Sequence, residues 1–182
     1  MEESIVEKST NRKGIILHIA LVAFMALAFG CGGDDDETSS AGSGNGNGEA
    51  NVASGLFSAL VSGNSFDATG DNDSIQGTYD SNLLAVSGFD FEYGPQGATI
   101  MLAVNGVTGP GTYTIEAFTS IPLQFTEGTT VYSTAMPGSS GTITVSSVSE
   151  TGAKGTFEFT AFNTNNDNTS VDVTDGVFDV TF

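Results

Sequence analysis

The stretch KGTFEFTAF, residues 154–162, decides the fold class, because it alternates between apolar and polar side chains. Phe157 and Phe159 lie on one side of the predicted strand, and the other side carries Thr156, Glu158 and Thr160. An alternation with period two is typical of a β-strand that buries one face. The stretch therefore predicts a sheet protein with a phenylalanine-rich core.

Similar alternation extends outward from this stretch through the second half of the chain. In GTITVSSV, residues 141–148, the alternation is interrupted at Ser146–Ser147, which predicts a β-bulge. FDFEY, residues 89–93, predicts an inward face of Phe89, Phe91 and Tyr93, with Asp90 and Glu92 outward. Two further strands are predicted to turn inward the side chains of Ile100, Leu102, Val104, Phe178, Val180 and Phe182.

Breakers rich in glycine, proline and asparagine separate these runs, and TDG at 174–176 predicts a tight hairpin turn. About ten short strands are expected, and no run has the length and period of an amphipathic helix. We expect one all-β antiparallel domain over residues 52–182. Its strand spacing fits a β-sandwich and a closed barrel equally.

The beginning of the chain has the pattern of a signal peptide, predicted over residues 1–30. Arg12 and Lys13 precede an apolar run of residues 15–29, which is shorter than the roughly 20 residues of a membrane-spanning helix. Small residues then flank Cys31, the only cysteine. This pattern resembles the lipobox of bacterial lipoproteins, which implies that Cys31 is the lipidation site. The alternatives are a secretory signal with a spare thiol and an uncleaved anchor.

Residues 31–51 are predicted to be a lipidated cysteine followed by an acidic tether rich in Gly, Ser and Asn. The acidic run Asp34–Glu37 resembles the surface-export signal of Bacteroidota-type lipoproteins. That resemblance implies an outer-membrane lipoprotein, anchored to the membrane through Cys31. We favour the cell surface over the periplasmic face.

The composition excludes most catalytic chemistry. The only histidine, His18, and the only arginine, Arg12, lie in the predicted signal peptide. After Cys31 the chain has nineteen acids and a single basic residue, Lys154, which give a net charge of −18. Ser-His-Asp and Cys-His catalysis need a histidine, as do most zinc and copper sites. Nucleic-acid binding needs many basic side chains. We therefore expect no enzyme and no nucleic-acid partner.

The candidate metal ligands are Asp67, Asp71 and Asp73, which fall within seven residues of a turn-rich loop. Calcium prefers such closely spaced oxygen ligands, although the loop lacks the EF-hand pattern. The alternative is a solvated loop whose acids cap their own turns. A second polar loop, residues 163–172, has the same two interpretations. No other cofactor is predicted.

The expected function is a lipid-anchored, non-enzymatic module of the cell envelope that binds a partner or serves a structural role. The alternative is a β-domain that binds a small ligand or a glycan, with calcium as a possible aid. A glycan or a basic protein is the expected partner, and the four tyrosines could form a sugar platform. A carboxylate-based hydrolase would have to use Glu92, Glu116 and Glu158.

Several segments together resemble a known family: LFSALVSGNSFDA, GPGTYTI, SGTITVSSVSETGAKGTFEFTAFN and VDVTDGVFDVTF, in that order. In these segments the chain is similar to an uncharacterised family of small Bacteroidota-type lipoproteins. The shared motifs are Gly-x-Gly-x-Tyr, Gly-x-Phe and Asp-Gly-x-Phe, and the likeness covers residues 56–182. The resemblance implies an all-β envelope domain and brings no established activity or catalytic residue.

Overall fold

A computed structural model describes residues 51–165 and 168–182, which belong to one compact unit. The predicted signal peptide, Cys31 and the acidic tether lie outside the described residues. The described part contains eleven strands and no helix. The strands are β1 (Asn51–Val61), β2 (Asn64–Asp67), β3 (Ser74–Asp80), β4 (Leu83–Asp90), β5 (Ala98–Asn105), β6 (Gly111–Glu116), β7 (Gln124–Glu127), β8 (Thr130–Ser133), β9 (Ser140–Ser149), β10 (Gly152–Asn163) and β11 (Ser170–Thr181).

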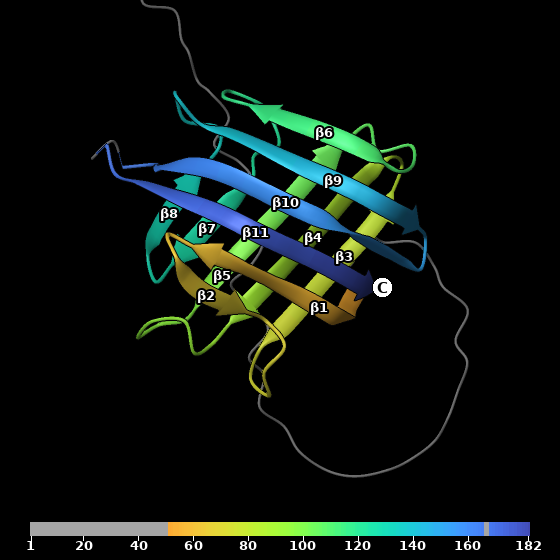
Figure 1. Cartoon of the computed structure of the whole chain (residues 1–182), viewed down its shortest axis with the longest axis horizontal. Helices are drawn as coiled ribbons and strands as arrows, with labels where there is room; N and C mark the ends of the chain where they lie inside the picture. The colour runs from red at the N-terminus through yellow and green to blue at the C-terminus, as the bar shows by residue number, and fades with distance from the viewer. Residues whose placement is uncertain (1–50, 166–167) are drawn as a thin grey trace, which may run out of the picture. The chain divides into compact units, whose positions relative to one another are not determined.

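All eleven strands pair antiparallel in one sheet that is not closed. Along the sheet the order is β11-β1-β3-β4-β5-β7-β8-β10-β9-β6, while β2 pairs with β1 and β10 also pairs with β11. The sheet folds over into two layers (Figure 1). The front layer contains β6, β9, β10, β11 and β1, and the back layer contains β3, β4, β5, β7 and β8. The all-β prediction is confirmed, and of the two predicted architectures the sandwich describes it. Within residues 51–165 and 168–182, no helix is long and apolar enough to span a bilayer.

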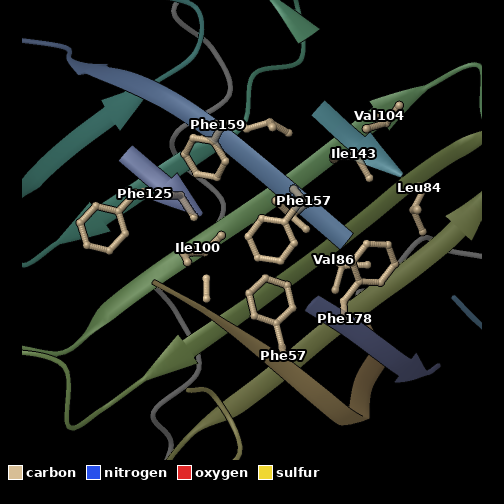
Figure 2. Packing of buried hydrophobic residues seen from close by; sticks show 14 of the residues in the cluster. Phe57, Leu84, Val86, Ile100, Val104, Phe125, Ile143, Phe157, Phe159 and Phe178 are labelled. Atoms are coloured by element: carbon tan, nitrogen blue, oxygen red, sulfur yellow. The ribbon is translucent and has the colours of Figure 1, made fainter. Parts of the chain in front are cut away.

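The core lies between the two layers and is built largely from phenylalanine. Phe57 of β1 and Phe157 of β10 lie with ring centroids 5.3 Å apart at its centre (Figure 2). Ile100 of β5 and Val86 of β4 face them from the back layer. Each such side chain contributes about 1.5–3 kcal/mol through its removal from water. The inward faces predicted for β5 and β10, and for Phe178 and Val180 of β11, are confirmed.

Several phenylalanine rings cover a glycine of a neighbouring strand or of a strand in the facing layer. The ring of Phe178 covers Gly155, and that of Phe57 covers Gly88. A methyl group at Gly155 would lie 2.7 Å from the Phe178 ring, well inside van der Waals contact. The glycines therefore provide the space that the rings fill. The core contains six buried phenylalanines: Phe57, Phe66, Phe125, Phe157, Phe159 and Phe178.

The inward face predicted for residues 89–93 was wrong for Phe89, Asp90 and Phe91, whereas Tyr93 packs against the core as predicted. β4 ends at Asp90, whose side chain points inward and is only 6% exposed, whereas Phe91 is 56% exposed. The alternation fails because the Asp90 carboxylate accepts three backbone N–H groups, which makes an inward acid favourable.

The hairpin turn predicted at 174–176 was also wrong, because β11 continues through it. Phe157 pairs with Gly176 and Phe159 with Val173, so β11 carries one extra residue there. Asp175 adopts a φ of 52°, which opens a β-bulge instead of a turn. The bulge predicted at Ser146–Ser147 is confirmed, because Ser146 is the unpaired residue between Val145 and Ser147.

Candidate functional site

The aspartates of the loop between β2 and β3 bind their own backbone. Asp67 Oδ1 accepts hydrogen bonds from the backbone N–H and the hydroxyl of Thr69, at 3.1 and 2.6 Å. Asp73 uses both oxygens, which accept from Gly70 N and from Phe91 N at 2.7 Å each. The second bond ties the loop to the end of β4. The bonds from Thr69 and Gly70 are the turn-capping bonds of the alternative interpretation.

The structure does not bring the three predicted ligands together. Asp71 is exposed, and no group of three or more His, Cys, Asp or Glu side chains in the described part of the chain is placed to hold a metal ion. The second polar loop also binds itself: Asn165 N donates to Asn163 Oδ1 at 2.8 Å, and Asn168 adopts a φ of 58°. Its residues 166–167 lie outside the described part.

Replacing Asp73 with alanine tests the role of this loop. We expect the free energy of unfolding to fall by about 1–2 kcal/mol, because two backbone donors lose a charged acceptor. The loss should be equal in millimolar calcium and in excess chelator, and Asp71→Ala should change nothing. Thermal melts of all three proteins measure this. A calcium-dependent stabilisation that Asp71→Ala removes would contradict the capping role and establish a metal site.

Asp90 is the one buried carboxylate of the described residues, and the sequence interpretation placed it outside. Its Oδ2 accepts from Asp67 N at 2.9 Å, and its Oδ1 accepts from Glu92 N and Tyr93 N at 2.9 and 3.0 Å. It therefore joins the end of β2 to the turn after β4. The sequence signal was its position four residues before the Gly94–Pro95 turn.

The four tyrosines do not form an exposed sugar platform. All four are partly buried against the core, and Tyr79 and Tyr113 donate to the backbone oxygens of Val107 and Gly109 at 2.7 Å each. Burial raises the pKa of the Tyr93 phenol, the carboxylates of Glu127 and Asp90 raise it further, and a hydrogen bond with Asn64 opposes them. These rings act as structural side chains at the margin of the core.

The predicted hydrolase glutamates are exposed and lie on separate strands or turns. Glu92 follows β4, Glu116 pairs with Ser140, and Glu158 pairs with Thr142. Glu158 and Asp175 both line a groove of about 450 Å³ on the outer surface of the front layer, which the β11 bulge helps to shape. This groove is rich in threonine hydroxyls, from Thr142, Thr144 and Thr156.

Charge is divided unequally between the two outer surfaces of the sandwich. The outward side chains of β6, β10 and β11 in the front layer carry many charges, all of them exposed: Glu116, Lys154, Glu158, Asp172 and Asp179. Lys154 Nζ lies 2.7 Å from Asp179 Oδ2. The opposite surface, the outward side of the back layer, has an ionisable outward side chain only at its border, Asp80 at the end of β3. Among the outward positions of the strands, the charges are therefore concentrated on the front layer.

We call the outward side of β3, β4, β5 and β7, apart from Ser74 and Asp80 at the two ends of β3, the uncharged face. Alternation fixes its members, because the intervening residues of each strand point into the core. All are half-buried or exposed except Ala103. The uncharged face consists of Gln76, Thr78, Leu83, Ala85, Ser87, Phe89, Thr99, Met101, Ala103, Asn105, Gln124 and Thr126.

A pocket of about 440 Å³ adjoins the uncharged face at Ala103 and Asn105; we call it the β5–β6 pocket. Its other walls are β6, which ends the strand order, and the segment 119–121. Every lining residue is uncharged: Ala103, Val104, Asn105, Thr112, Tyr113, Thr114, Ile115, Thr119, Ser120 and Ile121. The pocket and the uncharged face thus form one continuous neutral surface with amide, hydroxyl and apolar groups.

Sequence reasoning missed this surface, although a signal was present. Residues 83–89 and 98–105 contain no ionisable side chain, which is unusual in a chain of net charge −18. What the sequence did not contain was the strand order that sets these two segments side by side.

Comparison with known proteins identifies a family for the folded part of the chain. No curated protein and no solved structure matches the chain. A family model, the domain of unknown function DUF6252, matches residues 53–180, which covers nearly all of the sandwich. The chain therefore belongs to the DUF6252 family of domains of unknown function.

Proposed function

We propose that this chain is a lipid-anchored lipoprotein of the bacterial cell envelope, of Bacteroidota type, and that its sandwich is a non-enzymatic binding module. The anchor is Cys31, and the acidic run Asp34–Glu37 behind it supports display on the cell surface. Two or more acyl chains hold a protein on a membrane durably, at about 0.8 kcal/mol for each buried methylene.

The division of charge between the two outer surfaces carries the binding role. A ligand that docks on a carboxylate must remove water from it, which costs free energy unless the carboxylate is paired. The uncharged face and the β5–β6 pocket involve no such cost. Binding surfaces are likewise depleted of charge at their centre and enriched in aromatic residues and methionine. Phe89 and Met101 supply those groups here.

Acylation and display of the chain test the anchoring. We expect the full chain to incorporate labelled palmitate and to be reached by antibody on intact cells. Cys31→Ser should abolish the label and release the protein from membranes, because the thiolate is the acylated atom. Replacement of Asp34, Asp35 and Asp36 by alanine should keep the label but reduce surface detection. Acylation that survives Cys31→Ser would contradict the proposal.

A further inference from the structure

We propose that the uncharged face binds a neutral polysaccharide that lies across the back-layer strands and places one sugar unit in the β5–β6 pocket. This inference rests on the proposed binding function and specifies the chemical class of the ligand. Three observations carry it: the charge of the site, the pattern of its side chains and its size.

The charge of the site selects a neutral ligand. An anionic ligand needs a cation, and Lys154, the only basic residue from Asn51 onward, lies on the front layer beside Asp179. A cationic ligand would be drawn instead to the carboxylates of the front layer, because charge attracts over several ångströms. A neutral ligand gains no electrostatic attraction from those carboxylates. On the uncharged face, a neutral ligand can bind without removing water from a charged side chain.

The side chains of the face match the two sides of a sugar ring. Gln76, Ser87, Met101 and Gln124 are successive cross-strand partners and form a row over four strands. Amides and hydroxyls in this row can donate to and accept from sugar hydroxyls. Met101, with Phe89 in the next row, offers apolar contact to the C–H surface of a ring. The row advances by about 4.8 Å per strand, close to the length of one sugar unit in an extended chain.

The pocket suits the same ligand and lies beside Ala103, one row along β5 from Met101. Its volume of about 440 Å³ falls within the range of small-ligand sites, roughly 300–1,000 Å³. Asn105 and Thr119 supply polar groups, while Tyr113 contributes a ring and Ile121 an aliphatic wall. The Tyr113 hydroxyl already donates to Gly109 O, so its remaining capacity is that of an acceptor.

A second copy of the chain is a poorer occupant. Strand spacing and rise give the uncharged face an area of about 400 Å², whereas a stable dimer buries about 800 Å² on each partner.

Native gels that contain a polysaccharide test the inference on the full lipoprotein, extracted in a polyoxyethylene detergent that carries no sugar. The neutral probes are starch, mannan, xylan and a β-glucan, and polygalacturonate is the anionic probe. We expect at least one neutral polymer to retard the protein and polygalacturonate to leave it unaffected. Met101→Ala and Gln124→Ala should each weaken binding about tenfold, which corresponds to about 1.4 kcal/mol. The matched front-layer variants Val177→Ala and Thr144→Ala should bind as the parent does.

The other outcomes overturn the inference. Retardation by none of the neutral polymers, or equal retardation by polygalacturonate, would exclude a neutral glycan. Loss of binding in Thr144→Ala, with Met101→Ala unaffected, would move the ligand to the front groove and leave the binding function standing. A dimer in sedimentation that Met101→Ala dissolves would make a second copy the occupant. Failure of acylation at Cys31 would contradict the anchoring alone, whatever the gels show.

Discussion

Replacement of Asp90 by alanine is expected to lower the free energy of unfolding by about 4 kcal/mol, because three backbone donors lose one charged acceptor in a buried position. The bonds link the end of β2 to the turn after β4, so the loss affects two parts of the sheet together. Water cannot readily replace the carboxylate, which is 6% exposed. Urea unfolding of the full chain measures the change.

Two variants serve as controls for Asp90. Asp90→Asn keeps one carbonyl oxygen, which can still accept from Glu92 N and Tyr93 N, and should cost less than alanine. Asp71→Ala removes an exposed acid and should stay within about 0.5 kcal/mol of the parent. Equal effects of all three replacements would show that Asp90 acts only through the general charge of the domain.

Gly155→Val is expected to destabilise the domain by about 3 kcal/mol, because the new side chain overpacks a filled core. A Cβ atom there would overlap the backbone oxygen of Thr144 and lie 2.7 Å from the Phe178 ring. The ring could rotate away, but the oxygen belongs to the paired strand β9 and cannot. The midpoint of urea unfolding should fall accordingly.

The matched control for Gly155 is Gly109→Ala. A Cβ atom at Gly109 would meet no atom within 4 Å, so this variant should unfold at the same urea concentration as the parent. Phe178→Leu combined with Gly155→Ala should recover part of the stability that Gly155→Ala loses, since a smaller side chain frees the space above the glycine. No recovery would show that the clash is with the backbone alone.

The fold class could be predicted from the sequence because the alternation of apolar and polar residues is a local property. Residues 98–105 and 154–162 each bury every second side chain, and both predicted faces are confirmed. The prediction failed at two places, where a side chain accepts backbone hydrogen bonds and where a turn-like sequence forms a β-bulge. Asp90 is inward because it accepts hydrogen bonds, and TDG at 174–176 has turn chemistry that also serves a bulge.

The candidate site could not be predicted, because it depends on which strands become neighbours. Gln76 and Gln124 are 48 positions apart in sequence, yet they occupy one row across β3, β4, β5 and β7. The hydrophobic pattern fixes which way each side chain points and leaves the strand order open. Only the order gathers the neutral outward positions on one surface and the charged ones on the other.

The place of Lys154 in the sheet has a consequence for degradation. From Cys31 to Phe182 the only bond open to a protease that cuts after lysine or arginine is the one after Lys154. That residue lies in β10 and pairs with Ser147 on one side and Asp179 on the other. A protease needs its substrate as an unpaired extended segment, so the folded sandwich withholds its single cleavable bond, and a trypsin-like enzyme can reach that bond only when the sheet opens.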